Sequence, residues 1–402
     1  MEDGKGWSRR TLAAQALGRI DEATGGVVPP IHIATTFIRD DDGGYARGYA
    51  YGRPDNATVR EAEAVIAALE GAGGALLFSS GMAAATALFL ALKPGDHVLA
   101  PKVMYWALRD WLLTEAVRWG LLVDLVDMSD LSALEAAMRP GQTRLVWIET
   151  PANPLWTVTD IAGAAAIAHG AGALLAVDST AATPVLSRPL SLGADMVMHA
   201  ATKALNGHSD VIAGVLAVSD AGCEVWAHIQ RVRKLNGAIL GPFEAYLLMR
   251  GMRTVDLRVR AASATAHDLA RRLSNHLDVI GVLYPGLEHH LGHAVAVRQM
   301  PDGFGHMLSI RVRGGEAAAM RAAARVRLWK RATSLGGVES LIEHRASIEG
   351  PGSPCPPDLL RLSAGIEDPR RPLPRPRRGP ARGACVRRHG CAIQHIAVGD
   401  GP

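Results

Sequence analysis

Short apolar runs alternate with amphipathic segments from about residue 60 to residue 220. Helical periods predict helices at VREAEAVIAALEGAG, ALRDWLLTEAVRWG and IAGAAAIAHGAG. Between such segments lie apolar runs that predict strands: ALLF, HVLA, LVDLV, RLVWIE, LLAVD, MVMH and GVLAV. This alternation predicts an α/β fold with a mostly parallel sheet covered on both faces. A closed eight-stranded barrel is the competing architecture, but the helical stretch after Asn236 favours a second domain.

The pattern divides the chain into four predicted parts. Residues 1–48 are punctuated by Gly and Pro and predict an extended arm, and residues 49–244 carry the β/α alternation. Residues 245–368 predict a smaller α+β domain at the C-terminal side. Residues 369–402 are rich in Arg, Pro and Gly without an apolar period, so they are predicted to be disordered.

The longest charge-free apolar stretch, ALLFSSGMAAATALFLAL (75–92), has the length of a membrane helix. Because SSG interrupts it, a buried strand, a turn and a helix are the better interpretation. The N-terminal MEDGKGWSRR has no apolar segment of the kind that a secretory signal requires. The 4 cysteines form no CxxC pair, which argues against zinc and against a disulfide framework and favours a reducing cytoplasm.

The formal net charge of +4 is unevenly distributed. Residues 369–402 contain eight Arg, no Lys and one acid, Asp400, and therefore carry +7, which leaves −3 for residues 1–368. The basic character thus belongs to the tail, and the body has no general signature of nucleic-acid binding.

Lys203 is the most informative single residue. It follows the apolar run ADMVMHAAT and precedes Gly207, and Asp178 ends another apolar run, LLAVD, 25 positions upstream. Ligands of open parallel sheets collect at the carboxyl ends of the strands, where Glu149, Asp178 and His199 also lie. A lysine and a carboxylate at such ends suit pyridoxal 5'-phosphate, which needs an amine for covalent attachment and an acid beside its pyridinium nitrogen.

Seven motifs carry a resemblance to a known family. They are YGRPDNAT (51–58), SSGMAA (79–84), ETPANP (149–154), VDSTAATP (177–184), TKALNGHSD (202–210), SLGGVESLIEH (334–344) and LLRLSAGIED (359–368). Together and in this order, they resemble the pyridoxal-phosphate enzymes of cysteine and methionine metabolism, the trans-sulfuration enzymes. The resemblance implies the fold of aspartate aminotransferase (fold type I), with residues 49–244 as the cofactor-binding domain.

The resemblance also implies roles for individual residues. As catalytic residues it indicates Lys203, Asp178 and Tyr105, the last stacking on the pyridine ring. As cofactor-binding residues it indicates Gly81, Met82, Thr202, Asn153, Tyr51 and Arg53, the last two reaching the phosphate of a neighbouring subunit. As substrate-binding residues it indicates Arg361 on the α-carboxylate, Ser334 in support and Glu339 near a distal ammonium. Ala200 stands where the family commonly has serine, and HHLGH (289–293) resembles a surface segment of the family, so no metal site is expected.

The function implied is that of cystathionine gamma-synthase, in which cysteine displaces the acyl group of an O-acylhomoserine. Cystathionine beta- or gamma-lyase is the alternative, since the motifs do not separate synthesis from C–S cleavage, and transamination fits them less well. The resemblance further implies a cytoplasmic homodimer or homotetramer with shared active sites and an amino-acid substrate. An alternative of another class is an inactive product with an altered C-terminus, in which the Arg-rich tail binds nucleic acid.

Overall fold

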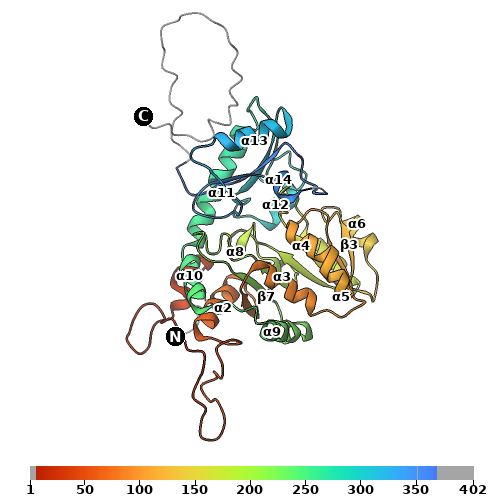
Figure 1. The fold of residues 1–402 in the computed structure, drawn as a ribbon. Coiled ribbons are helices and arrows are strands. Elements are labelled where there is room, and N and C mark those ends of the chain that lie inside the picture. Colours follow the sequence, from red (N-terminus) through yellow and green to blue (C-terminus); the bar gives the residue numbers. More distant parts are fainter. Residues whose placement is uncertain (1–5, 351, 369–402) are drawn as a thin grey trace, which may run out of the picture.

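The computed structural model of the protein describes residues 6–350 and 352–368 (Figure 1). Within these residues the larger sheet has seven strands in the order β1-β7-β6-β5-β4-β2-β3. Their bounds are β1 (Gly74–Phe78), β2 (His97–Pro101), β3 (Leu122–Val126), β4 (Thr143–Glu149), β5 (Leu174–Asp178), β6 (Met196–His199) and β7 (Gly214–Val218). From β3 to β6 all neighbours are parallel, whereas β7 is antiparallel to both β6 and β1.

The sheet is open, with β1 and β3 at its edges, so the barrel alternative is wrong and the predicted mostly parallel sheet is confirmed. Each of the seven apolar runs forms a strand. The stretch 75–92 divides as predicted into β1, a two-residue turn and helix α3 (Gly81–Leu90). No helix in the described part of the chain is long and apolar enough to span a bilayer.

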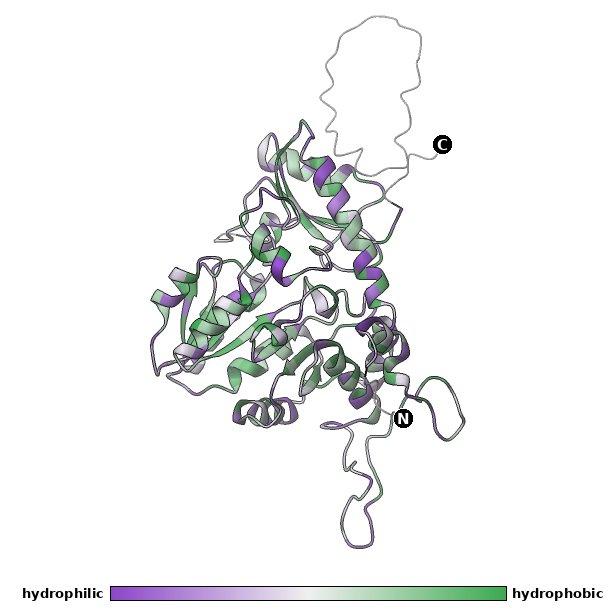
Figure 2. Ribbon diagram, turned by 180° about the vertical axis from the view of Figure 1, so that it is seen from behind, coloured by the Kyte–Doolittle hydropathy of each residue, from purple (hydrophilic) through white to green (hydrophobic). Residues whose placement is uncertain are grey.

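Both faces of the larger sheet are buried, which explains why its strands are apolar at nearly every position. Leu76 and Phe78 pack on one face with α3, α4 (Trp106–Trp111) and α9 (Glu224–Asn236). Leu77 between them packs on the other face with α2 (Ala57–Glu70) and α10 (Pro242–Met252). Trp147 follows the same alternation and contacts Phe89 of α3, with ring centroids 5.3 Å apart. Figure 2 shows the hydrophobic strands enclosed by these helices.

Helices surround the larger sheet and connect its strands. They are α2 (Ala57–Glu70), α3, α4 (Trp106–Trp111), the π-helical η2 (Leu112–Ala116), α5 (Val117–Trp119), α6 (Leu131–Ala137), α7 (Ile161–Gly170), α8 (Thr183–Leu186), η3 (Pro189–Leu192), α9 (Glu224–Asn236) and α10 (Pro242–Met252). Two short helices precede them, α1 (Arg9–Gln15) and η1 (Ala16–Gly18).

A second, five-stranded sheet in the order β10-β11-β12-β9-β8 forms the core of the smaller α+β part. Its strands are β8 (Val279–Leu283), β9 (Met307–Val312), β10 (Lys330–Arg331), β11 (Leu341–His344) and β12 (Leu359–Ser363). The accompanying helices are α11 (Val255–Leu273), α12 (His293–Gln299), α13 (Gly315–Arg325) and α14 (Ala346–Glu349). Leu308, Ile310, Leu360 and Leu362 pack against α11 and α13.

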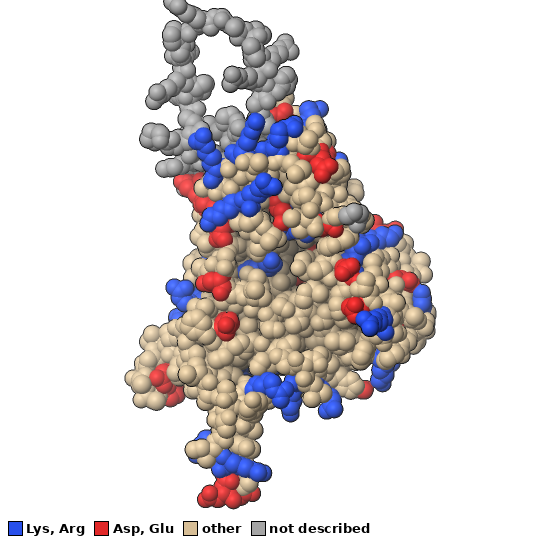
Figure 3. All heavy atoms as spheres, in the orientation of Figure 1, with Lys and Arg blue, Asp and Glu red and all other residues tan. Residues whose placement is uncertain are grey.

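The predicted boundary after residue 244 falls within α10, and the four-part division remains a prediction. Between α1 and α2 the chain forms long loops that extend from the body in Figure 1. Three apolar side chains there are largely exposed, namely Val27 (78%), Ile33 (76%) and Ile38 (87%). In Figure 3 Lys and Arg side chains gather over the smaller part at the top of the view, whereas the middle of the larger part is mostly uncharged. The predicted disorder of residues 369–402 and their proposed nucleic-acid binding lie outside the described residues.

Candidate active site

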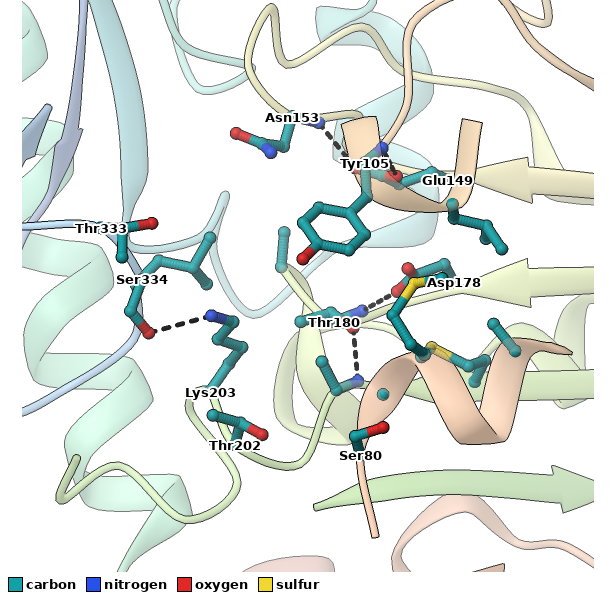
Figure 4. Close-up of a pocket in the computed structure, with 18 of the residues that line it drawn as sticks. Ser80, Tyr105, Glu149, Asn153, Asp178, Thr180, Thr202, Lys203, Thr333 and Ser334 are labelled. Carbon is teal, nitrogen blue, oxygen red and sulfur yellow. Dashed lines mark hydrogen bonds between the residues drawn. The ribbon is translucent and has the colours of Figure 1, made fainter. Parts of the chain in front are cut away.

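The carboxyl ends of the parallel strands enclose a pocket of about 280 Å³ together with β12 and the segments that flank β11 in the smaller sheet (Figure 4). Nine of the twelve predicted site residues line it: Gly81, Met82, Tyr105, Asn153, Asp178, Thr202, Lys203, Ser334 and Arg361. Eight of them come from six of the seven motifs, which span almost 300 residues of sequence, and Tyr105 lies outside the motifs. The fold therefore brings these residues to one place, as expected for the crevice at strand ends in α/β sheets.

Lys203 lies on the loop that follows β6. Its Nζ donates a hydrogen bond to Ser334 Oγ at 2.9 Å, so the amine is held between the two parts of the molecule. Burial, assisted by the positive charge of Arg361, lowers the pKa of Lys203 to about 8. An uncharged amine is the form that attacks a carbonyl or accepts a proton, so this environment suits a nucleophile or a base.

Two further residues shape the lysine loop. Gly207 has φ +73°, and a Cβ on it would lie 1.7 Å from Nη1 of Arg258, so only glycine fits there. The buried Arg258 donates to the carbonyl oxygens of Ala204 (2.8 Å) and Leu205 (3.2 Å). These bonds satisfy backbone groups of a loop that has no regular structure of its own, which fixes the loop's conformation.

Asp178 is the last residue of β5 and is 8% exposed. Its Oδ1 accepts a hydrogen bond from the Thr180 amide at 3.0 Å, while Thr180 Oγ1 accepts one from the Ala200 amide at 2.8 Å. Burial raises the pKa of Asp178, and the bonds from Thr180 oppose that shift. A cationic partner in the pocket would reverse the shift, because an opposite charge favours the ionised carboxylate.

Glu149 ends β4 and pairs in register with Asp178 on β5. One of its oxygens accepts from the Tyr105 amide at 2.7 Å and the other from the Asn153 amide at 2.8 Å. Burial, together with the negative charge of the adjacent Asp178, raises the pKa of Glu149 to about 8. The sequence placed Glu149 at a strand end without assigning it a role. The contacts indicate that it orients two other residues of the pocket.

The raised pKa predicts a pH-dependent stability for the cofactor-free protein. Because the pKa of Glu149 is higher in the folded chain, the folded state binds more protons than the unfolded state, and unfolding free energy falls as pH rises from 4.5 to about 8. Glu149→Gln removes this titration. We expect the melting temperature of wild type to fall more steeply across this window than that of the variant. Equal slopes in calorimetric scans would contradict the assignment.

The N-terminus of α3 faces the pocket with Ser80, Gly81 and Met82. Ser80 Oγ caps the helix by accepting from the Ala83 amide at 3.0 Å. Among the described residues the amides of Gly81 and Met82 have no acceptor. A Cβ on Gly81 would lie 2.9 Å from the Cβ of Ala200, so the backbone approaches the next loop closely. Open amides at a helix N-terminus suit a phosphate.

Thr202 is placed beside this helix end but is already hydrogen-bonded. Its Oγ1 donates to the Ala213 carbonyl at 3.2 Å and accepts from the Ala213 amide at 3.0 Å. To donate to a phosphate, the hydroxyl would exchange the carbonyl for the anion while still accepting from the amide. Its predicted role is therefore compatible with the geometry and requires one hydroxyl rotation.

Arg361, on β12, forms the opposite wall of the pocket and is 4% exposed. Nη1 donates to Asn153 Oδ1 at 3.2 Å, and Nη2 donates to the Ser334 carbonyl at 2.9 Å. Nη2 also contacts Glu343 Oε2 at 2.6 Å. Ser334 has φ +82°, an uncommon conformation for serine of the kind found at functional sites. It contacts Lys203 through its side chain and Arg361 through its backbone.

Three predicted residues do not line the pocket. Tyr51 is 49% exposed, and Arg53 donates to the Lys234 carbonyl at 2.7 Å while its guanidinium lies 5.8 Å from the Tyr51 ring centroid. Glu339 accepts from Ser209 Oγ at 2.5 Å at an exposed position. Conversely, sequence reasoning missed Thr180, Trp156 and Arg345 as lining residues. Each lies in or directly beside a quoted motif, so proximity to those motifs was the available signal.

The pocket contains what pyridoxal phosphate requires. It has open helix-end amides for the phosphate, a carboxylate for the ring nitrogen and a buried lysine amine. The Tyr105 ring, 42% exposed, points into the same space in Figure 4 and offers a stacking surface. The residues present therefore fit this cofactor.

Comparison with known proteins agrees with this fit. Residues 10–370 match the family described as Cys/Met metabolism PLP-dependent enzyme. A Mycobacterium tuberculosis protein named cystathionine gamma-synthase is 45% identical over 365 residues, 89% of this chain and 93% of its own. Cystathionine gamma-lyase of Bacillus subtilis is 39% identical over 356 residues, 87% of this chain and 92% of its own. The crystal structure of cystathionine gamma synthase from Xanthomonas oryzae pv. oryzae in complex with cystathionine superposes with a TM-score of 0.85 at 38% identity, covering 90% of this chain and 94% of that one.

Proposed function

The chain belongs to the family of Cys/Met metabolism PLP-dependent enzymes, and on that basis we propose that it synthesises cystathionine from an O-acylhomoserine and cysteine. The observation that carries the proposal is the position of Ser334, which joins the Lys203 amine to the Arg361 guanidinium across one pocket. This arrangement suits an α-amino acid, whose reacting carbon lies between an amine and a carboxylate. The mycobacterial relatives named cystathionine gamma-synthase are 43% to 45% identical to the chain, whereas two relatives named cystathionine gamma-lyase are 39% identical, which supports synthesis over cleavage.

The cofactor would be held by the amides of Gly81 and Met82 at its phosphate, by Asp178 at its ring nitrogen and by Lys203 covalently. Bound pyridoxal phosphate withdraws electrons from the substrate Cα and so makes the proton there removable. Asn153 would lie beside the phenolic oxygen and Tyr105 over the ring. Glu149 would keep both in place through their backbone amides.

Arg361 would bind the α-carboxylate, because a planar fork of N–H donors matches two carboxylate oxygens. Lys203 would take the proton from Cα, for which its lowered pKa of about 8 is suitable. Reaction at Cγ needs a second proton to leave Cβ, and Lys203 can carry that one too. In the net replacement the Cγ–O bond breaks, the acyl group leaves as a carboxylate, and the sulfur of cysteine bonds to Cγ with loss of its proton.

We further propose a homodimer or homotetramer with shared sites in the cytoplasm. The segment with Tyr51 and Arg53 does not line its own pocket, and the exposed apolar residues of the loops after α1 would be covered by another subunit. Glu339 would face the distal ammonium of a cystathionine-like substrate. The described cysteines, Cys223 and Cys355, are free thiols, as expected in a reducing compartment. Light scattering that finds an active monomer would contradict the assembly.

A substrate panel tests the reaction. The purified protein, loaded with pyridoxal phosphate, is given O-acetyl- or O-succinylhomoserine with cysteine, and separately cystathionine alone, and products are identified by mass. Cystathionine formed in the first assay supports the synthase. Thiol and keto-acid release from cystathionine, without synthesis, would instead assign a lyase.

Arg361→Lys is expected to lower kcat/KM by about one to two decades, because lysine keeps the charge but loses the two-pronged hydrogen bond, which costs about 1.5–3 kcal/mol. Steady-state kinetics on the variant measures the loss. The matched control is Arg298→Lys, an exposed arginine of α12 paired with Asp160. If the kcat/KM of Arg361→Lys equals that of the control variant, the substrate carboxylate binds elsewhere.

A further inference from the structure

A chain of four buried charged side chains extends outward from the substrate side of the pocket. It comprises Arg361, Glu343, Arg345 and Glu349, each between 4% and 6% exposed. Glu343 Oε2 accepts from Arg361 Nη2 at 2.6 Å and from Arg345 Nη1 at 2.8 Å. Glu349 Oε1 accepts from Arg345 Nη2 at 2.7 Å and from its Nε at 3.1 Å. Positive and negative groups therefore alternate along the chain.

Local structure accounts for this order. Glu343 and Arg361 are register partners on the adjacent strands β11 and β12, so their contact is a cross-strand pair. Arg345 follows β11 directly, and Glu349 ends the single-turn helix α14 four residues later. The segment EHRASIE therefore supplies three of the four charges. Arg345 also lines the pocket, although the proposed function gives it no role.

The sharing of Glu343 between two arginines has an electrostatic consequence. A buried carboxylate paired with Arg361 alone would neutralise the guanidinium and weaken its attraction for a substrate carboxylate. With Arg345 on the same oxygen, the negative charge is divided between two cations. Glu349 then balances the second cation at the end away from Arg361. The four charges sum to zero, and Arg361 is the positive end of the alternating chain.

We infer that Arg345 is a positioning residue that keeps Glu343 from neutralising the carboxylate-binding Arg361. The inference rests on the proposed function, because it assumes that Arg361 binds the α-carboxylate. It deepens that function by assigning carboxylate affinity to a charge network rather than to one arginine. It also explains why the chain buries two extra charges, Arg345 before α14 and Glu349 at its end, where apolar residues would often give equal stability.

Removing Arg345 alone would leave Glu349 buried without its cation, so the test variant is Arg345→Met/Glu349→Gln. The probes are L-norleucine and n-pentylamine, which share the amine and the alkyl chain and differ in the carboxylate. Their inhibition constants are measured against turnover of the holoenzyme. The pentylamine-to-norleucine ratio of these constants then reports recognition of the carboxylate and cancels effects common to both ligands.

We expect the double variant to lower this ratio about tenfold, with kcat changed by less than about threefold, since a charged hydrogen bond is weakened rather than the base removed. Adding Glu343→Gln should restore most of the ratio, because the carboxylate that captures Arg361 is then uncharged. A merely structural role would not be rescued by losing a further charge. The matched control is the largely buried pair Arg233 and Glu63, which does not line the pocket; changed to Met and Gln, it should leave the ratio unaltered.

Two outcomes would overturn the inference, namely an unchanged ratio in the folded double variant and a failure of Glu343→Gln to restore it. Failure of the proposed function would give a different pattern of inhibition-constant ratios. In that case the wild-type ratio is near one, or Arg361→Lys leaves it intact. A high wild-type ratio that collapses in Arg361→Lys but not in the Arg345 variants removes only the role of Arg345.

Discussion

Lys203→Ala is expected to abolish turnover, with a loss of at least about 10³-fold, because one amine serves both as the covalent anchor and as the base. The variant should still fold, since within the described residues the Lys203 side chain makes a single hydrogen bond, to Ser334. It should also lose the visible absorbance of a covalently bound cofactor. Borohydride reduction of wild type followed by peptide mapping should locate the cofactor on the peptide that contains Lys203.

The control for this prediction is Lys102→Ala, which changes an exposed lysine directly after β2. It should retain absorbance and turnover. Recovery of reduced cofactor on any peptide lacking Lys203 would refute the assignment. So would a Lys203→Ala protein that keeps the absorbance band. The lowered pKa of Lys203 gives a second readout, since amine-directed labelling of the cofactor-free protein should modify this lysine with a midpoint near pH 8.

The larger sheet could be predicted from the sequence because a strand that is buried on both faces has apolar residues at consecutive positions. Leu76, Leu77 and Phe78 show why, since consecutive side chains enter opposite cores. The positions of Lys203 and Asp178 followed from the same pattern, as residues at or just beyond strand ends. The implied roles of most pocket residues came from motifs and remain proposals.

Residues that act through tertiary contacts could not be predicted in this way. Arg258 hydrogen-bonds to the carbonyl of Ala204 in the lysine loop, 54 positions away in the sequence. Glu149 orients Tyr105 through the backbone amide of Tyr105, and a contact to the backbone cannot be inferred from side-chain patterns. The network around Arg345 depends on the register of β11 against β12. The predicted role of Tyr51 and Arg53 cannot be assessed within one chain, because the resemblance places them in the active site of a second subunit.

Asp178→Asn is expected to retain or raise the stability of the cofactor-free protein and to lower its activity once the cofactor is bound. Burial raises the pKa of Asp178 in the cofactor-free protein, so the folded state binds the proton more tightly than the unfolded chain does. The carboxyl's contribution to stability is therefore present at low pH and lost as pH rises through the folded pKa. An asparagine of nearly the same shape avoids that loss. At pH 8 the cofactor-free variant should melt at a temperature equal to or above that of wild type.

With the cofactor bound, the Asp178→Asn substitution should instead be unfavourable and lower activity. Asp178 then faces a pyridinium nitrogen, and the opposite charge favours both ionised forms, whereas an amide cannot stabilise the cation. Each unit lost from the pKa of the ring nitrogen corresponds to about a tenfold smaller protonated fraction, so turnover should fall at least about 10²-fold while absorbance of the bound cofactor persists. Asp195→Asn, at a carboxylate that contacts His169 outside the pocket, is the control. Turnover within about threefold of wild type would show that Asp178 does not support the ring charge, because so small a change is worth less than 1 kcal/mol.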